Sequence, residues 1–316
     1  MRALSTGADL LLPAGQSLHA LVLARFHHAV HLMLDDGRLM TLLRGDAPHG
    51  MRVINVAHVD WVAIHPWLDA GQRALLDAAQ LSHARFVLRR SARVWQAPDL
   101  NVLMRDVPDM SEAGGARGQA IRTCRAWLRQ RQGVMEAGMS APAWRLWRAA
   151  LLAFGGVLDA MQAHADGEAR IDAAVAGALG LGPGLTPSAD DMIAGLLIGL
   201  RAARVTDPCV ARLAVSVRRH WHATSTASRD MLEQAMRGWT TSCMADVCTA
   251  VAHGAAVPGL AHALAKQAAI GQCSGVDTLI GFCAGLDAGS TCQAGAVPLG
   301  AGAAARRKAP NERMPA

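Results

Sequence analysis

The sequence predicts an α+β fold in which a small β-rich N-terminal module precedes a larger, mainly helical domain. Three observations predict it: short apolar segments with hairpin chemistry fill the first hundred residues, Pro, Gly, Ser and acidic residues gather at 108–118, and apolar residues then recur at helical spacing. We therefore expect a β-rich module over residues 1–108, a helical domain over 109–287 and a disordered tail over 288–316.

The strand candidates of the module are short apolar runs bounded by turn residues. They comprise residues 18–25, 29–34, 39–43, 51–56 and 85–94. Asp35, Asp36 and Gly37 supply hairpin chemistry between the second and third of them. A short helix is predicted at 72–81, between the last two strands.

The helix candidates of the second domain carry apolar residues three and four positions apart. They comprise residues 116–131, 143–163, 168–179, 188–203, 208–222, 228–238, 242–253, 258–269 and 274–286. The Ala/Gly-rich stretch after them ends in charged and proline-containing sequence, which predicts disorder.

Composition excludes several classes of protein. With 52% hydrophobic and 18% charged residues among 316, the chain is not a disordered one. Its longest apolar run, at 192–200, stops at Arg201 and is far shorter than the roughly 20 residues that span a membrane. The first residues make a poor signal peptide because Asp9 and Pro13 interrupt them. We expect a cytoplasmic protein without a membrane partner.

Cysteine usage and charge give weaker information. The seven cysteines include no CxxC pair, which favours reduced buried thiols over a zinc site. The net charge of +6 is carried almost wholly by arginine, which pairs well with carboxylates and phosphates. A compositional bias toward arginine and alanine explains the same excess, so charge gives no reason to expect a nucleic-acid partner.

A glycine-rich turn at 180–187 is the strongest candidate for a functional site. Gly180, Gly182 and Gly184 permit positive φ angles, and such a turn can present successive N–H groups to an anion. Thr186 and Pro187 then read as the N-cap and first residue of a helix.

The start of that helix admits other readings. A capping box between Ser188 and Asp191 is the alternative to a Thr186 cap. Either arrangement directs N–H groups and the positive end of the helix dipole into the turn. Glycines after a helix and acids in a first turn also serve as plain caps. However, Asp190 and Asp191 point about 100° apart on a helix, so they cannot share one role.

The same pattern occurs a second time in the chain. Residues 188–200 and 274–286 both read S-x-x-D-x-x-x-G-x-x-x-G-L. In each, two glycines four positions apart share one helix face and allow another backbone to approach closely. Our hypothesis is that these two helices pack together and bring both N-termini to one pocket. Asp191 and Asp277 would then be equivalent, and Asp190 would be an additional group.

A third candidate segment begins another helix between those two. Residues 225–229 combine three hydroxyl groups with the guanidinium of Arg229. Such a set binds phosphate or carboxylate, or it caps the helix. Its place between the two aspartate-bearing helices favours the binding role, with Ser228 and Arg229 as the residues to test.

The segment Gly182-Pro183-Gly184-Leu185-Thr186-Pro187-Ser188-Ala189-Asp190-Asp191 resembles the GxGLTPSGDD signature of a bacterial family long catalogued as a domain of unknown function. That family includes a subunit of oxamate carbamoyltransferase, an enzyme of allantoin degradation. Residues 270–277 resemble its second motif, which usually reads close to GHSSGxD. Two departures are Ala189 in place of the usual Gly and Gln272-Cys273 in place of His-Ser. Losing the histidine matters if that side chain moves protons.

The resemblance implies a subunit of a transferase that interconverts oxalurate and phosphate with oxamate and carbamoyl phosphate. The catalytic candidates are Asp190, Asp191 and Asp277. The residues expected to bind substrate or phosphate are Gly182, Gly184, Leu185, Thr186, Ser188, Ser228, Arg229, Ser274 and Gly275. Asp190 and Asp191 would bind Mg²⁺ or orient the reacting amide, because bare carboxylates repel phosphate.

Two rival functions remain open from the sequence. One is another phosphate- or nucleotide-dependent enzyme, such as a kinase, that uses the same loop and acids. The other is a non-catalytic subunit, structural or metabolite-binding, within a complex whose chemistry another chain performs. The expected partners are a small anionic substrate and other subunits.

Overall fold

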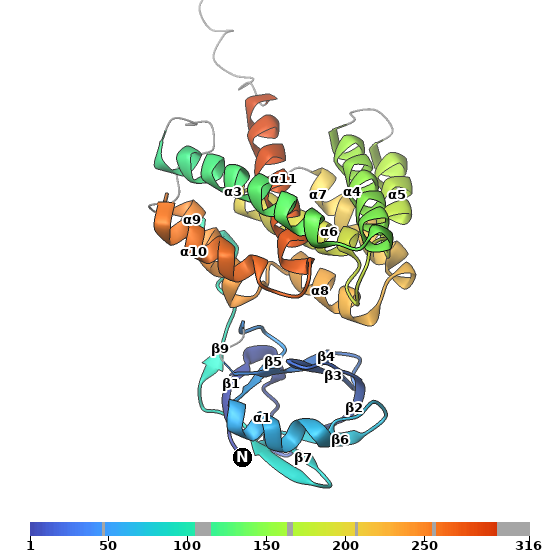
Figure 1. Cartoon of the computed structure of the whole chain (residues 1–316), viewed down its shortest axis with the longest axis vertical. Helices are drawn as coiled ribbons and strands as arrows, with labels where there is room; N and C mark the ends of the chain where they lie inside the picture. Colours follow the sequence, from blue (N-terminus) through green and yellow to red (C-terminus); the bar gives the residue numbers. More distant parts are fainter. Residues whose placement is uncertain (46–47, 105–114, 163–166, 206–207, 255–256, 296–316) are drawn as a thin grey trace, which may run out of the picture.

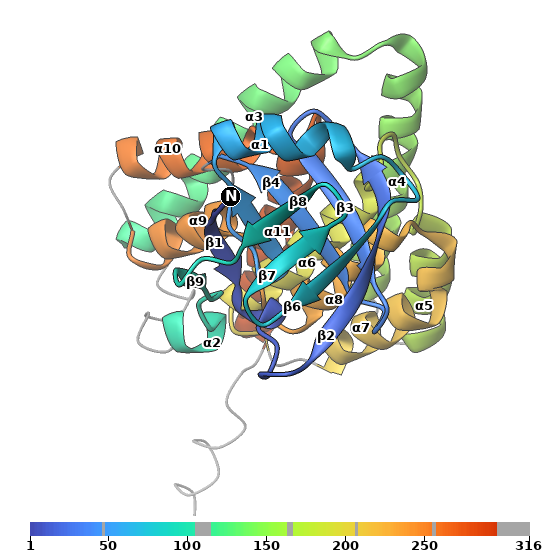
Figure 2. The same ribbon diagram turned by 90° about the horizontal axis from the view of Figure 1, so that it is seen from below.

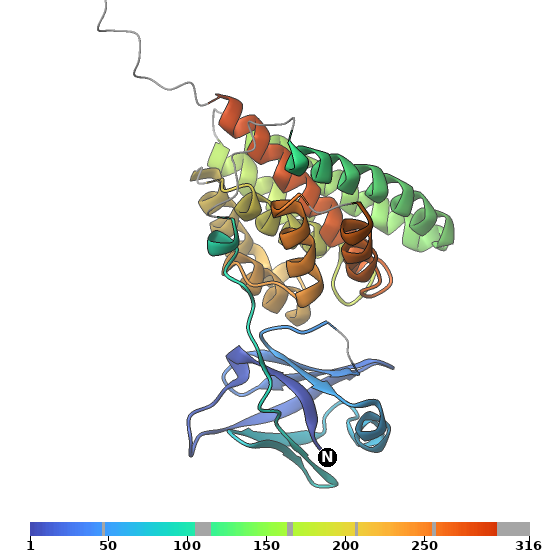
Figure 3. The same ribbon diagram turned by 90° about the vertical axis from the view of Figure 1, so that its left-hand side faces the viewer.

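The computed structural model describes residues 1–45, 48–104, 115–162, 167–205, 208–254 and 257–295. A strand-rich module is followed by a helical domain, so the predicted α+β fold is confirmed (Figure 1). The chain crosses from one part to the other through residues 96–99, between β9 and α2 (Figure 3). The predicted domain boundary lies mostly in residues 105–114, outside the described residues.

The module consists of one curved sheet, which faces the viewer in Figure 2. Its strands are β1 (Ala3–Gly7), β2 (Ser17–Arg25), β3 (Ala29–Leu34), β4 (Leu39–Arg44), β5 (Val53–Val56), β6 (Arg73–Asp77), β7 (Gln80–His83), β8 (Phe86–Arg89) and β9 (Val94–Trp95). Their order is β8-β7-β6-β2-β3-β4-β5-β1-β9. Neighbours pair antiparallel except for β4 with β5 and β1 with β9, which pair parallel.

The helix predicted at 72–81 is wrong, because this segment forms the β6–β7 hairpin. The side chain of Asp77 accepts hydrogen bonds from the N–H groups of Ala79 (2.7 Å) and Gln80 (2.9 Å). An aspartate that bonds the backbone two and three residues ahead folds a tight turn and competes with helix formation. The other predicted strands are present, and the 85–94 segment divides into β8 and β9. Strand β1 was not predicted.

The module has its own hydrophobic core. Alternate residues of the sheet point inward, including Leu32, Leu42 and Leu76, and Trp61 of α1 (His58–Ile64) covers them. Two short 3-10 segments complete the module, η1 (Ala8–Leu10) and η2 (His65–Trp67). This core is separate from that of the helices.

The helical domain closely follows the predicted pattern. Its elements are α2 (Leu100–Leu103), α3 (Ala116–Gly138), α4 (Ala141–Gln162), α5 (Gly167–Ala178), α6 (Ser188–Ala202), α7 (Pro208–His220), η3 (Trp221–Ala223), α8 (Thr226–Met236), α9 (Ser242–Ala252), α10 (Val257–Ala268) and α11 (Ser274–Gly295). No helix among the described residues is long and apolar enough to cross a membrane.

Helix α11 is longer than predicted. It continues past Leu286 to Gly295, so residues 288–295 of the expected disordered tail are helical. Asp287, just before this segment, pairs with Arg125 of α3, which fixes α11 against α3 beyond the predicted end of the helix. The rest of the predicted tail, 296–316, lies outside the described residues.

Helices α6 and α11 pack directly on each other at the centre of the domain, as the repeated glycine pattern predicted (Figure 1). A Cβ added to Gly195 would lie 2.0 Å from the carbonyl oxygen of Thr278, and one on Gly281 would lie 1.8 Å from that of Met192. Real Cβ atoms do not approach backbone so closely, so glycine is required at both places. The two backbones therefore meet, and their N-termini lie at the same end of the pair.

Candidate functional site

The glycine turn before α6 has the backbone conformation that the sequence predicted. Gly180, Gly182 and Gly184 have φ angles of 82°, 125° and 98°, which other residues rarely adopt. A Cβ on Gly182 would also lie 2.3 Å from the backbone nitrogen of Ser188. The turn therefore folds tightly against the first residue of the helix.

Both predicted helix caps are wrong. Pro187 occupies the N-cap position and no side chain caps the helix. The N–H of Ala189 donates to the carbonyl of Leu181 (3.0 Å), and that of Asp191 donates to the carbonyl of Pro187 (3.2 Å). With these donors already bonded to backbone carbonyls, the hydroxyl of Thr186 donates instead to Oδ2 of Asp191 (3.1 Å). Thr186 thus orients a carboxyl group of the candidate site.

The turn nevertheless keeps several N–H donors. Within the described part of the chain, the N–H groups of Gly182, Gly184, Leu185, Thr186 and Ser188 make no hydrogen bond. Backbone N–H groups are strong donors that seek an acceptor. A loop with successive donors of this kind has the chemistry of an anion-binding nest.

Asp190 connects two turns. Its Oδ1 accepts from the N–H of Gly180 (2.9 Å), and its Oδ2 accepts from the hydroxyl of Thr224, just before α8. Burial raises the pKa of Asp190, and the hydrogen bonds from Thr224 and Gly180 oppose that shift. Both carboxylate oxygens already have partners, which favours a structural role.

Asp191 and Asp277 form a buried carboxyl pair at the start of the two helices. Both are at most 1% exposed. Burial raises the pKa of Asp191 well above its ordinary value, and the charge of Asp277 raises it further. Burial also raises the pKa of Asp277, to about 6, although the indole N–H of Trp147 donates to its Oδ1 at 2.7 Å. The pair therefore retains a proton to a higher pH than exposed aspartates do.

One oxygen of this pair lacks a hydrogen bond. Within the described residues, Oδ2 of Asp277 has no partner of ordinary geometry, although Ser188 and Cys273 lie close enough to lower its pKa. The hydroxyl of Ser188 and the thiol of Cys273 face each other at 3.6 Å. Burial raises the pKa of Cys273 to about 12, so its thiol is neutral and a poor nucleophile. An unpaired buried carboxylate oxygen can accept an N–H or O–H group of a ligand.

The three candidate segments meet here. The hydroxyls of Thr186 and Ser274 are 3.0 Å apart and join the glycine turn to α11. The bond between Asp190 and Thr224 joins α6 to the start of α8. The packing of the two helices and the proximity of their N-termini are therefore confirmed, while a pocket between them stays a prediction.

The start of α8 is capped as one of the two readings predicted. The side chain of Ser225 accepts from the N–H of Ser228 (3.1 Å), while the hydroxyl of Ser228 is buried without a hydrogen-bond partner among described residues. Arg229 donates to the carbonyls of Trp221 (2.8 Å) and Thr224 (3.1 Å). Its guanidinium stabilises the turn before α8, and pairing with a substrate carboxylate stays a prediction.

Gly275 and Leu185 take different places in this arrangement. A Cβ on Gly275 would lie 2.0 Å from the carbonyl oxygen of Gln267, so this glycine lets α11 begin against the end of α10. Leu185 is 44% exposed, at the outer side of the turn.

Trp147 and Thr224 were not assigned to the site from the sequence, since neither lies in a motif.

The Mg²⁺ prediction finds little support in these contacts. Among the described residues, no group of three or more His, Cys, Asp or Glu side chains is placed to hold a metal ion. Both oxygens of Asp190 already accept a hydrogen bond, from the N–H of Gly180 and from the hydroxyl of Thr224. Magnesium binding stays a prediction, and no step below depends on it.

Comparison with known proteins identifies a family whose model matches part of the chain. The model of the family described as "Oxamate carbamoyltransferase subunit AllH" matches residues 178–286, about a third of the chain. This range contains the glycine turn, α6, the start of α8 and the first half of α11. No curated protein and no solved structure matches the chain significantly. The match supports a relationship to a family of transferase-associated subunits over the part that forms the candidate site.

Proposed function

We propose that the chain is a subunit of an oxamate carbamoyltransferase-like enzyme and that the α6–α11 site handles its substrates. The reaction interconverts oxalurate and phosphate with oxamate and carbamoyl phosphate. The family match over 178–286 supports the transferase association. The role of this site in the reaction is our inference from its chemistry.

One observation carries the proposal: backbone N–H groups that make no hydrogen bond within the described residues belong to the same turn that bonds the buried carboxyl group of Asp191. The turn at 182–188 offers backbone donors, and Asp191, bonded to Thr186 of that turn, lies with Asp277 beneath it. Carbamoyl phosphate and oxalurate each combine an anionic end with amide N–H groups. Donors suit the anionic end, and carboxyl oxygens suit the N–H groups.

The carboxyl pair can also move a proton. In phosphorolysis, a phosphate oxygen attacks the ureido carbonyl of oxalurate, a C–O bond forms and the C–N bond to oxamate breaks. The departing amide nitrogen needs a proton, which a protonated Asp191–Asp277 pair can donate. In the reverse direction the ionised pair accepts that proton from oxamate. The raised pKa of Asp277, about 6, suits both roles near neutral pH.

Ligand binding to the purified full chain tests the proposal. We expect carbamoyl phosphate or oxalurate to raise the melting temperature, since a ligand at one hundred times its Kd stabilises by about 2.7 kcal/mol. Sulfate controls for nonspecific anion effects. Asp191→Asn should abolish the shift, whereas Asp246→Asn, at an exposed position of α9, should not.

Two outcomes count against the proposal. One is the absence of any shift with carbamoyl phosphate, oxalurate, oxamate or phosphate. The other is a shift that Asp191→Asn and Asp277→Asn leave unchanged, which would place the ligand elsewhere. Phosphate-dependent release of oxamate from oxalurate, measured on the chain together with its co-purified subunits, then tests the reaction itself.

A further inference from the structure

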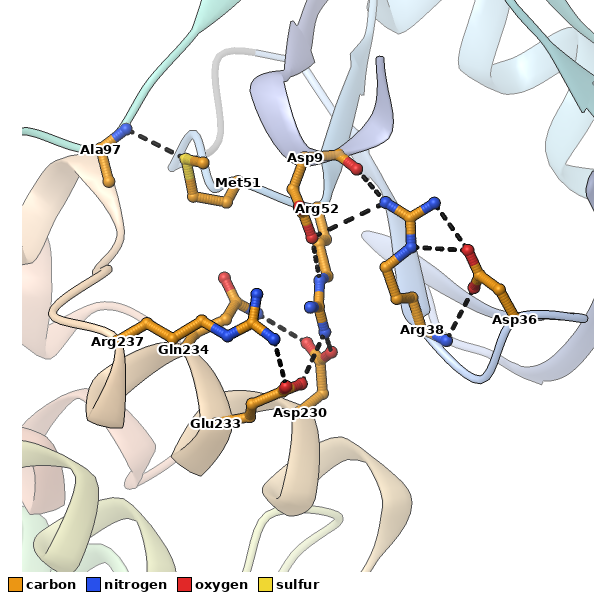
Figure 4. Close-up of polar contacts among 10 residues, drawn as sticks. All are labelled: Asp9, Asp36, Arg38, Met51, Arg52, Ala97, Asp230, Glu233, Gln234 and Arg237. Carbon is orange, nitrogen blue, oxygen red and sulfur yellow. Dashed lines mark hydrogen bonds and ion pairs between the residues drawn. The ribbon is translucent and has the colours of Figure 1, made fainter. Parts of the chain in front are cut away.

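The N-terminal module contacts the helical domain through Arg52, which immediately precedes β5. Its side chain is only 4% exposed. Nε donates to Asp9 of the module at 2.6 Å, and Nη1 pairs with Asp230 and, at 3.2 Å, with Glu233 of α8. Figure 4 shows Arg52 between the carboxylates of the two parts. One guanidinium therefore bridges the sheet module and a helix of the other domain.

A second contact lies three residues earlier. The N–H of His49 donates to the hydroxyl of Ser242 (3.0 Å), and the N–H of Ser242 donates to the carbonyl of His49 (2.9 Å). Ser242 begins α9. The segment between His49 and Arg52 thus holds the module against both α8 and α9.

The buried charge of Arg52 is stabilised by the carboxylates of Asp9 and Asp230. Burial disfavours the charge on Arg52, but Asp230 and Asp9 outweigh that cost and raise its pKa. Burial raises the pKa of Asp230, and the charge of Arg52 opposes that shift. Removing one member of such a group leaves a buried charge without its partner, which is strongly destabilising.

Helix α8 links this contact to the candidate site. Asp230 lies two residues after Ser228, so their side chains leave the helix on opposite sides. Asp230 faces Arg52, while the Ser228 hydroxyl, which has no hydrogen bond of ordinary geometry, lies close enough to Asp190 to lower its pKa. Thr224, one residue before the N-cap of α8, donates to Asp190 directly. A displacement of α8 at Asp230 would therefore move the groups that contact α6.

We propose that the N-terminal module is a positioning element for the site and that Arg52 is the residue through which it acts. Arg52 sets the position of the first turn of α8, and through Thr224 the position of Asp190 and the glycine turn. This role extends beyond the family match, which begins only at residue 178.

Hydrogen exchange on the full chain without ligand tests the link. Arg52→Met should raise amide exchange in 221–229 and in 180–191 by about tenfold. Arg52→Lys keeps the positive charge but loses the planar guanidinium that bonds several carboxylates at once, so it should give a smaller rise in exchange. The matched control is Arg38→Met, because Arg38 bonds Asp9 and Asp36 and does not reach α8. If Arg52→Met does not fold, Asp230→Asn is judged by the same criteria.

The proposal would be overturned if exchange rose only in the module and in residues 230–237 and stayed unchanged in 180–191. Arg52 would then hold the two parts of the chain together without positioning the site. Equal effects of Arg38→Met would overturn it too. A second readout rests on the proposed function: the Kd for inorganic phosphate should rise about fivefold or more in Arg52→Met and stay unchanged in Arg38→Met. If the wild type binds neither phosphate nor any of the three other ligands, the proposed function fails while the exchange result still decides the role of Arg52.

Discussion

The hydroxyl groups of Thr186 and Ser274 are 3.0 Å apart although 88 residues separate them in the chain. Thr186 ends the glycine turn, and Ser274 is the first residue of α11. The same Thr186 hydroxyl lies 3.1 Å from Asp191, so it links the turn to the buried carboxyl pair as well as to the second helix. The turn that precedes one patterned segment is thereby joined to the first residue of the other.

A double-mutant cycle should detect this link. Thr186→Val keeps the shape and removes the hydroxyl, and Ser274→Ala removes the other. Because hydrogen-bonded groups couple, the two unfolding free energies should be non-additive by about 1 kcal/mol in urea denaturation. Thr186→Ser restores a hydroxyl and should restore the coupling. Additive effects within about 0.3 kcal/mol would show that the bond contributes nothing.

The contact between α6 and α11 predicts a strong effect of single methyl groups. Gly281→Ala places a Cβ 1.8 Å from the carbonyl oxygen of Met192, so the helices must separate. We expect destabilisation of about 3 kcal/mol or more, measured by chemical denaturation. Gly156→Ala in α4 is the control, because nothing lies within 4 Å of its Cβ, and it should stabilise by about 0.5–1 kcal/mol. Similar effects of both substitutions would contradict the close packing.

Periodicity and turn chemistry predicted most of this architecture because both are local properties of the chain. The helix starts at Ser188, Ser242 and Ser274 follow directly from apolar spacing. The glycine pattern went further, since a missing Cβ on one face of each helix predicts a close partner. The failed helix at 72–81 shows the limit, because the segment is held by strand pairing with β2 and β8 and by the Asp77 turn, which apolar spacing does not reveal.

The sequence predicted which segments form the candidate site, but not the hydrogen bonds that its residues make. The sequence predicts a catalytic role for both Asp190 and Asp191. The structure distinguishes them, because Asp190 accepts hydrogen bonds from Gly180 and Thr224. Thr224 and Trp147 come from distant segments and carry no motif, so no local pattern could find them. The Arg52 contact was missed for the same reason, because a buried ion pair across 178 residues depends wholly on tertiary structure.

The raised pKa of Asp277 predicts how stability depends on pH. Its pKa is raised by burial from an ordinary 3.8 to about 6, so the unfolded chain loses this proton at lower pH than the folded protein. The contribution is complete below about pH 4 and is lost as pH rises through about 6. Unfolding free energy should fall by roughly 2–3 kcal/mol across that range relative to Asp277→Asn.

Denaturant unfolding at several pH values measures this difference. Asp277→Asn should reduce the fall, because the amide has no proton to lose, and the part that remains comes from Asp191, whose pKa burial also raises. The variant should match or exceed the wild type at pH 8. The exposed Asp246→Asn substitution should leave the slope unchanged. Parallel curves for wild type and Asp277→Asn would mean that Asp277 titrates as an exposed group.

Trp147 provides a separate test of the same carboxyl group. Its indole N–H donates to Oδ1 of Asp277 at 2.7 Å, and this bond favours the ionised form. Trp147→Phe removes the donor, so the pKa of Asp277 should rise above 6 and the loss of stability should shift to higher pH. The smaller ring also leaves a cavity, but that cost is the same at every pH.

The midpoint of the stability–pH curve therefore separates the two effects of Trp147→Phe. We expect a midpoint shifted upward by about half a unit or more, since a hydrogen bond to a charged group is worth about 1.5–3 kcal/mol. Trp144→Phe, at a half-buried tryptophan of α4 that lies beside Arg148, should change stability without moving the midpoint. A midpoint that stays in place or moves downward in Trp147→Phe would show that the indole does not stabilise the carboxylate.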